Sequence, residues 1–144
     1  MEINGIAHVI LTVRDMAVSR VFYRGLLAHF GLTEVIDSSE YLYFVGGRTA
    51  VGLRPATGPA ANERFDQGRA GLHHVSFRAR SREDVDSVHD FVLGLGATVI
   101  HGPEEAHWVQ GYYSVLFEDP DGIRLEVNYV PGKGIFEPGV VPGA

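Results

Sequence analysis

The sequence predicts an α+β fold in which two βαβββ modules form a curved mixed sheet around a cleft. Two segments, GIAHVILTV (5–13) and GLHHVSFRA (71–79), align without a gap and share Gly, His and Val in register. The same pattern of elements follows each of them: one amphipathic stretch typical of a helix, then three β-rich runs. With 144 residues, the chain is long enough for one domain with its own core.

The single domain therefore divides into two modules, a linker and a tail. We place the first module at 5–54 and the second at 71–130. Residues 55–70 are polar and rich in Gly, Ala and Pro, which is typical of a linker. The tail, 131–144, contains several Pro and Gly and is predicted to be irregular.

Each predicted helix begins after a residue that caps helices well. Asp15 precedes the first helix, and Ser81 precedes the second. Asp84 follows Ser81 by three residues and resembles the second member of a capping box, with Asp in place of Glu. The apolar faces expected of the two helices are Val18, Val21, Phe22 and Gly25 in the first and Val85, Val88, Val92 and Leu95 in the second.

Both modules are predicted to end in a β-hairpin. In the first, YLYFV and RTAVGLR flank Gly46-Gly47, a strong signal for a two-residue turn. In the second, YYSVLFE and IRLEVNY flank DPDG (119–122), whose Pro and Gly favour turn geometry.

Composition excludes several classes of function. The net charge of −6 and the scattered basic residues argue against nucleic acid or an anionic membrane surface as a partner. The chain has no cysteine, which excludes disulfides, thiol nucleophiles and zinc–thiolate sites. No apolar run reaches the roughly 18 residues that a membrane helix needs, and the N-terminus lacks a signal pattern. A cytoplasmic location is the expectation.

Strand alternation brings three residues of metal-binding types to one face of the predicted sheets. Neighbouring strand residues point to opposite faces, so the apolar set of each strand is expected to pack under its helix. His8, His74 and Glu126 then share the helix-free face, and His73 points to the other side. Two histidines and a carboxylate are the ligands of an open divalent-metal site, which suits Fe(II), Mn(II), Zn(II) or Ni(II).

With these repeats and candidate ligands, the sequence resembles the vicinal oxygen chelate superfamily, which includes glyoxalase I, fosfomycin-resistance proteins and extradiol dioxygenases. The resemblance covers about residues 5–130 and depends most on FEDPDGIRLEV, whose pattern is similar to the superfamily's last hairpin and final ligand. It implies paired βαβββ modules, a divalent metal on His8, His74 and Glu126, and a substrate that offers two adjacent oxygens. Homodimers are common in the superfamily and are expected here.

The sequence departs from each subfamily at a different position. The superfamily's fourth ligand slot falls on Gly52, which offers no side chain for a glyoxalase base. The tyrosine that the dioxygenases and fosfomycin-resistance proteins place ten residues before the last ligand is here Leu116. His107 matches the position of the dioxygenases' additional histidine, so it is a candidate acid or base. Tyr113, or its neighbour Tyr112, is a candidate phenol donor.

The expected function is that of a metal-dependent enzyme acting on a small molecule with neighbouring oxygens, through lyase, isomerase or dioxygenase chemistry. Arg54, Arg78 and Arg124 share the parity of the metal ligands and would favour an anionic substrate. The alternative is a binding or resistance protein of the same fold that sequesters a small molecule or antibiotic without turnover. The histidine and glutamate ligands count against that alternative.

Overall fold

The computed structural model describes residues 2–3, 5–107 and 109–133. The chain forms two compact units, residues 1–65 and residues 66–144, called unit 1 and unit 2 below. The boundary between them falls inside the predicted linker. The structure defines each unit by itself, and the predicted tail lies outside the described residues from 134 onward.

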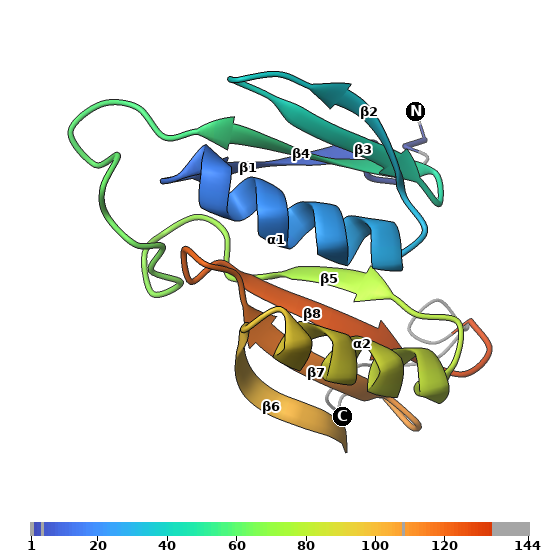
Figure 1. The fold of residues 1–144 in the computed structure, drawn as a ribbon. Helices are drawn as coiled ribbons and strands as arrows, with labels where there is room; N and C mark the ends of the chain where they lie inside the picture. The colour runs from blue at the N-terminus through green and yellow to red at the C-terminus, as the bar shows by residue number, and fades with distance from the viewer. Residues whose placement is uncertain (1, 4, 108, 134–144) are drawn as a thin grey trace. The chain divides into compact units, whose positions relative to one another are not determined.

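Unit 1 is a βαβββ module. Its elements, in chain order, are β1 (His8–Val13), α1 (Met16–His29), β2 (Thr33–Asp37), β3 (Leu42–Gly46) and β4 (Thr49–Pro55). The sheet order is β1-β4-β3-β2, with β1 parallel to β4 and the other pairs antiparallel. Helix α1 lies along one face of this sheet (Figure 1).

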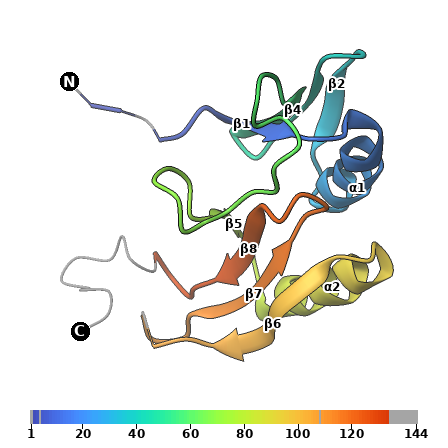
Figure 2. The ribbon, with the colours of Figure 1, turned by 90° about the vertical axis from the view of Figure 1, so that its left-hand side faces the viewer.

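Unit 2 repeats the module. Its elements are β5 (Val75–Arg78), α2 (Arg82–Gly94), β6 (Thr98–Glu105), β7 (Tyr113–Glu118) and β8 (Arg124–Tyr129). The order β5-β8-β7-β6, with β5 parallel to β8, matches unit 1 strand for strand. Figure 2 shows α2 on one side only of its sheet. The α+β fold of two βαβββ modules is confirmed.

Both predicted helix caps are confirmed. The Asp15 carboxylate accepts hydrogen bonds from the backbone N–H groups of Ala17 and Val18. The Ser81 hydroxyl accepts from the Asp84 N–H, and the Asp84 carboxylate accepts in return from the Ser81 N–H. Reciprocal bonds of this kind satisfy N–H groups that have no partner inside the helix.

The valines predicted for the buried face of α2 are buried, whereas the face predicted for α1 is right for Phe22 and wrong for Val18 and Val21. In α2, Val85, Val88 and Val92 are buried as expected. In α1, Val18 and Val21 are 51% and 73% exposed. The helix buries Phe22 together with Tyr23, Leu26 and Leu27. Two apolar stripes compete in this helix, and the one with more apolar area faces the sheet because burial energy scales with area.

The first hairpin turns one residue later than the predicted glycine pair. Gly46 pairs with Thr49, which leaves Gly47 and Arg48 as the two turn residues. Both have positive φ, at 58° and 68°, as hairpin turns of this length require. Arg48 is the one non-glycine residue with positive φ in the described part of the chain.

One face of each sheet is apolar and buried. Leu11 and Val13 of β1 and Leu125 and Val127 of β8 are buried, as their alternation predicts. The residues between them therefore lie on the helix-free faces, where the predicted ligands belong. Over the described residues, no helix is both long and apolar enough to span a bilayer.

Candidate functional site

His74 and Glu126 meet on the helix-free face of unit 2. His74 directly precedes β5, and Glu126 lies in β8 opposite Ser76. The His74 Nε2 atom is 3.2 Å from Glu126 Oε2. Glu126 is buried. An imidazole nitrogen and a buried carboxylate thus converge on one point, as two ligands of one metal ion would.

Tyr112 holds the other oxygen of the same carboxylate. Its hydroxyl donates a hydrogen bond to Glu126 Oε1. Burial, and secondly this hydrogen bond to Glu126, raise the pKa of the Tyr112 phenol above its ordinary value, so the hydroxyl stays a donor at neutral pH. Beside it, the Asn128 side-chain amide donates to Ser76 Oγ over 2.6 Å. Glu126 is therefore oriented by fixed neighbours.

The structure places Tyr113, the predicted phenol donor, next to helix α2. Its hydroxyl donates to Asp86 Oδ1 over 2.7 Å, and the Arg82 guanidinium lies 3.9 Å from its ring centroid. The hydrogen bond to Asp86 raises the pKa of this phenol. The two tyrosines have different partners, and Tyr112, which directly precedes β7, is the one that reaches Glu126. The sequence named both residues but gave no means of choosing between them.

His73 contacts His74, contrary to the prediction that the two point to opposite faces. Their Nδ1 atoms are 2.8 Å apart, within hydrogen-bond distance. Strand β5 begins only at Val75, so the alternation used for the prediction does not apply to these two residues. A hydrogen bond from His74 Nδ1 to His73 would fix the imidazole with Nε2 directed at Glu126.

His8, the other predicted ligand, begins β1 in unit 1. It is exposed, and its ring meets the Tyr43 ring edge-on with the centroids 6.5 Å apart. The registers of the two sheets make its position equivalent to that of His74. Two residues after His8, Ile10 pairs with Gly52, just as Ser76 pairs with Glu126 two residues after His74.

The position equivalent to Glu126 in unit 1 is therefore Gly52, as the sequence predicted, and the space above it is filled. A Cβ atom built on Gly52 would lie 2.7 Å from Ile10 Cδ1 and 2.7 Å from Tyr43 Cδ2. The Tyr41 hydroxyl would be 3.1 Å away. No metal-binding side chain fits at this position without displacing Ile10 and Tyr43.

The three predicted substrate arginines have different surroundings. Arg78 donates to the backbone carbonyl of Gly132 over 3.0 Å, and its side chain lines a pocket of about 380 Å³ in unit 2. Arg124 Nε lies 3.5 Å from Glu118 Oε1 on the neighbouring strand. Arg54 makes no hydrogen bond or ion pair with any other described residue, and it lines a pocket of about 480 Å³ in unit 1.

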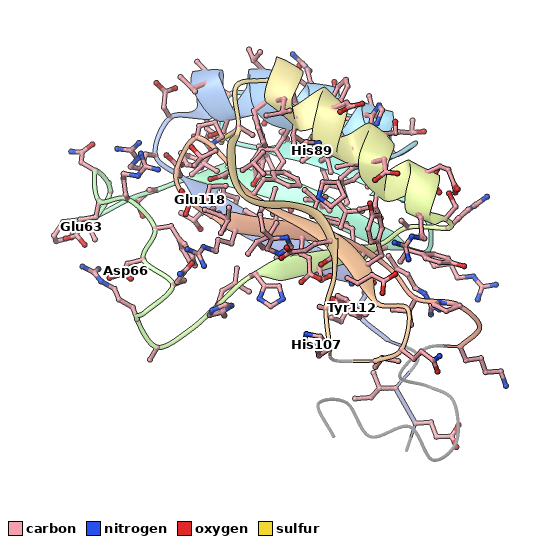
Figure 3. The ribbon with its side chains drawn as sticks, turned by 90° about the horizontal axis from the view of Figure 1, so that it is seen from below. Glu63, Asp66, His89, His107, Tyr112 and Glu118 are labelled. Carbon is pink, nitrogen blue, oxygen red and sulfur yellow. The ribbon has the colours of Figure 1, made fainter. Side chains whose placement is uncertain are left out.

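His107, the predicted acid or base, lies in the connection between β6 and β7. Figure 3 shows it close to Tyr112 in this connection. The connection is closed by a hydrogen bond from the Ala106 N–H to the Tyr112 carbonyl, 3.0 Å long. His107 is exposed and forms no hydrogen bond with another described residue.

The donor set agrees in part with the predicted metal. No group of three His, Asp or Glu side chains comes together within the described residues. His74 and Glu126 supply two of the three predicted ligands, with one nitrogen and one oxygen atom. These two residues fit a divalent ion of the iron, manganese, zinc or nickel type, and His8 belongs to the other unit.

Comparisons with known proteins agree with this fold. Residues 5–127 match the family model of the "Glyoxalase/Bleomycin resistance protein/Dioxygenase superfamily". The uncharacterized protein YqjT of Bacillus subtilis (strain 168) is 28% identical over 121 residues, which cover 83% of this chain and 94% of that protein.

Solved structures of similar fold come from several bacteria. A glyoxylase/bleomycin resistance protein/dioxygenase domain from Frankia sp. EAN1pec superposes with a TM-score of 0.72 at 27% identity, covering 89% of this chain and 98% of that one. A lactoylglutathione lyase from Agrobacterium tumefaciens gives a TM-score of 0.66 at 26% identity, covering 90% and 96%. The duplicated βαβββ module and the match over 5–127 lead to one conclusion: the chain belongs to the glyoxalase/bleomycin resistance protein/dioxygenase superfamily.

Proposed function

We propose that this chain is a divalent-metal-dependent enzyme that acts on a small substrate bearing two neighbouring oxygen atoms. In this proposal His8, His74 and Glu126 hold the metal, and the remaining positions bind the substrate. The observation that carries the proposal is the 3.2 Å approach of His74 Nε2 to the buried Glu126 carboxylate.

The surroundings of Glu126 support a ligand role more than a purely structural one. A buried carboxylate needs partners that compensate for the lost water. The Tyr112 hydroxyl donates to one oxygen of Glu126. The other oxygen lies 3.2 Å from the Nε2 atom of His74, a nitrogen that could bind a metal together with it. Tyr112 and His73 then act as the neighbours that orient ligands, the role that hydrogen-bonded groups around a metal usually have.

The bound metal would supply Lewis acidity, which stabilises negative charge on a substrate oxygen by several kcal/mol. The chain's own residues orient the substrate and handle protons. His107 is the candidate acid or base because it is exposed beside Tyr112 and has no described partner to hold its ring. Gly52 carries no base, so a proton acceptor equivalent to Glu126 is missing from unit 1.

Metal content tests the proposal directly. We expect the purified protein, reconstituted separately with Fe(II), Mn(II), Zn(II) and Ni(II), to retain close to one equivalent of at least one metal. His8→Ala, His74→Ala and Glu126→Ala should each lose it. His89→Asn is the matched control, since His89 lies on α2 and its Nδ1 atom is 3.5 Å from Asp90.

A low metal content would contradict the proposal. Retention of less than about one tenth of an equivalent after reconstitution, with no difference between the wild type and Glu126→Ala, would rule out the metal-dependent enzyme. Loss of metal from His89→Asn would show that the variants act through folding, which circular dichroism of each variant checks.

A further inference from the structure

Two tyrosines of unit 1 form a stack that begins at the proposed metal ligand His8. The Tyr41 and Tyr43 rings are nearly parallel, 17° apart, with centroids separated by 5.6 Å. The His8 ring meets the Tyr43 ring edge-on, with the centroids 6.5 Å apart. The order of the rings is therefore His8, Tyr43 and Tyr41, and all three side chains belong to unit 1.

The stack exists because residue 52 is a glycine. Gly52 pairs with Ile10 on one side and with Tyr43 on the other, so any side chain at 52 would stand where the Tyr43 ring now lies. Unit 2 has Glu126 at the same register position. The duplicated module thus carries a carboxylate in one copy and an aromatic surface in the other.

Tyr41, at the end of the stack, lines a pocket of about 480 Å³. The other lining residues are Ile10, Glu40 and Arg54. The volume lies within the range of small-molecule sites, roughly 300–1,000 Å³. Ile10 supplies an apolar surface, Tyr41 a π surface, and the two charged residues supply groups that can orient an occupant.

Neither charge in this pocket is neutralised by a neighbour in the described structure. Arg54 is exposed and forms no ion pair or hydrogen bond with another described residue, and the same holds for Glu40. Arg78 and Arg124, in contrast, have partners in unit 2. A guanidinium group beside an aromatic ring is a good receptor for a carboxylate on a planar molecule.

We propose that this pocket binds an aromatic carboxylate, with the ring against Tyr41 and Ile10 and the carboxylate on Arg54. Glu40, which also lines the pocket, disfavours a second negative charge on the ring and favours a hydrogen-bond donor such as a hydroxyl group. The stack places the pocket near His8, so the occupant is a candidate substrate of the enzyme. That part of the proposal rests on the proposed function. The binding itself does not.

Calorimetric titration of the full chain with 4-hydroxybenzoate tests the pocket. Two analogues separate the contributions: 4-hydroxybenzamide keeps the ring and lacks the charge, and cyclohexanecarboxylate keeps the charge and lacks the ring. We expect the wild type to bind 4-hydroxybenzoate more tightly than either analogue. Arg54→Ala should weaken binding about tenfold, since a charge-assisted hydrogen bond is lost, and Arg54→Lys should retain part of it.

Tyr41→Leu should weaken binding about 2- to 10-fold while leaving the thermal unfolding midpoint close to that of the wild type. Arg64→Ala, which removes an arginine outside the pocket, is the control and should bind like the wild type. Equal affinity of the wild type and Arg54→Ala, or no preference for the aromatic acid over cyclohexanecarboxylate, would overturn the proposal.

Glu126→Ala distinguishes this proposal from the proposed metal function. We expect this variant to lose metal and still bind 4-hydroxybenzoate in the metal-free state, because no pocket residue is a proposed metal ligand. A wild type that holds metal and fails to bind the probe at millimolar concentration would refute the pocket and leave the metal function standing.

Discussion

At the scale of single residues, the site depends on which tyrosine reaches Glu126. Tyr112 donates to the carboxylate, whereas Tyr113, the next residue, donates to Asp86 on α2. Tyr112→Phe should therefore lower the affinity for the metal about tenfold, the usual size of such an effect when a hydrogen bond to a ligand is removed. Tyr113→Phe, a change of the same chemistry one residue away, should leave it unchanged.

Competition with a chromogenic chelator measures both variants. Equal losses in the two would mean that the phenols act through general stability, and no loss in Tyr112→Phe would mean that the hydrogen bond does not position Glu126. Circular dichroism and thermal unfolding of each variant exclude a change of fold.

Gly52 offers a second test on one residue. A methyl group at 52 would lie 2.7 Å from atoms of Ile10 and Tyr43, and overpacking of this kind costs about 1–3 kcal/mol. We expect Gly52→Ala to lower the free energy of unfolding by that amount in a urea titration. Gly94→Ala is the matched control, because a Cβ atom there meets nothing within 4 Å and alanine favours the helix. An unchanged stability of Gly52→Ala would show that the tyrosines yield easily.

At the scale of elements, the capping box of α2 is a contact that both the sequence and the structure contain. Ser81 and Asp84 exchange hydrogen bonds between side chain and backbone. Ser81→Ala should destabilise the protein by about 1 kcal/mol. Ser81→Asn, which keeps a side-chain oxygen that can cap the helix, should cost little, since Asn and Ser are about equally good caps. Urea denaturation of both variants compares the effects, and equal stabilities would contradict the capping role.

The elements show where sequence reasoning succeeds. Order, caps and hairpins were predictable because each depends on local patterns: the repeat, the Ser81-x-x-Asp84 spacing and the DPDG turn. The buried face of α1 was not, because two apolar stripes satisfy the same periodicity and only packing against the sheet selects one.

The site shows where the reasoning stops. Glu126 lies 3.2 Å from His74, as parity predicted, although only Glu126 lies within a strand and His74 directly precedes β5. Parity failed for His73, which lies before the strand begins. It also gave no sign that Tyr41 and Tyr43 would fill the space over Gly52, because that contact joins side chains of three strands whose register no local pattern specifies.

At the scale of the whole molecule, the two copies of the module have diverged in what they carry. Unit 2 has His74, Glu126 and Tyr112 on its helix-free face. Unit 1 keeps His8 but has tyrosines where the second carboxylate would be. In the proposed site, this difference between the units gives one set of ligands per chain instead of two. In unit 1 the space over residue 52 holds the contact of Ile10 and Tyr43 instead.

The number of proposed ligands in each chain predicts how much metal the protein binds. Each chain has one His8, one His74 and one Glu126, so the proposed site holds about one metal per chain whether its ligands come from one copy or from two copies of the expected homodimer. His8→Ala and Glu126→Ala should each lose all of it. Two metals per chain, or one variant that keeps its metal, would contradict the shared site. Refolding the two variants as an equal mixture then identifies the source of the ligands. A dimer that shares its sites regains one intact site in each mixed pair, about one quarter of the wild-type metal content, whereas sites made within one chain regain none.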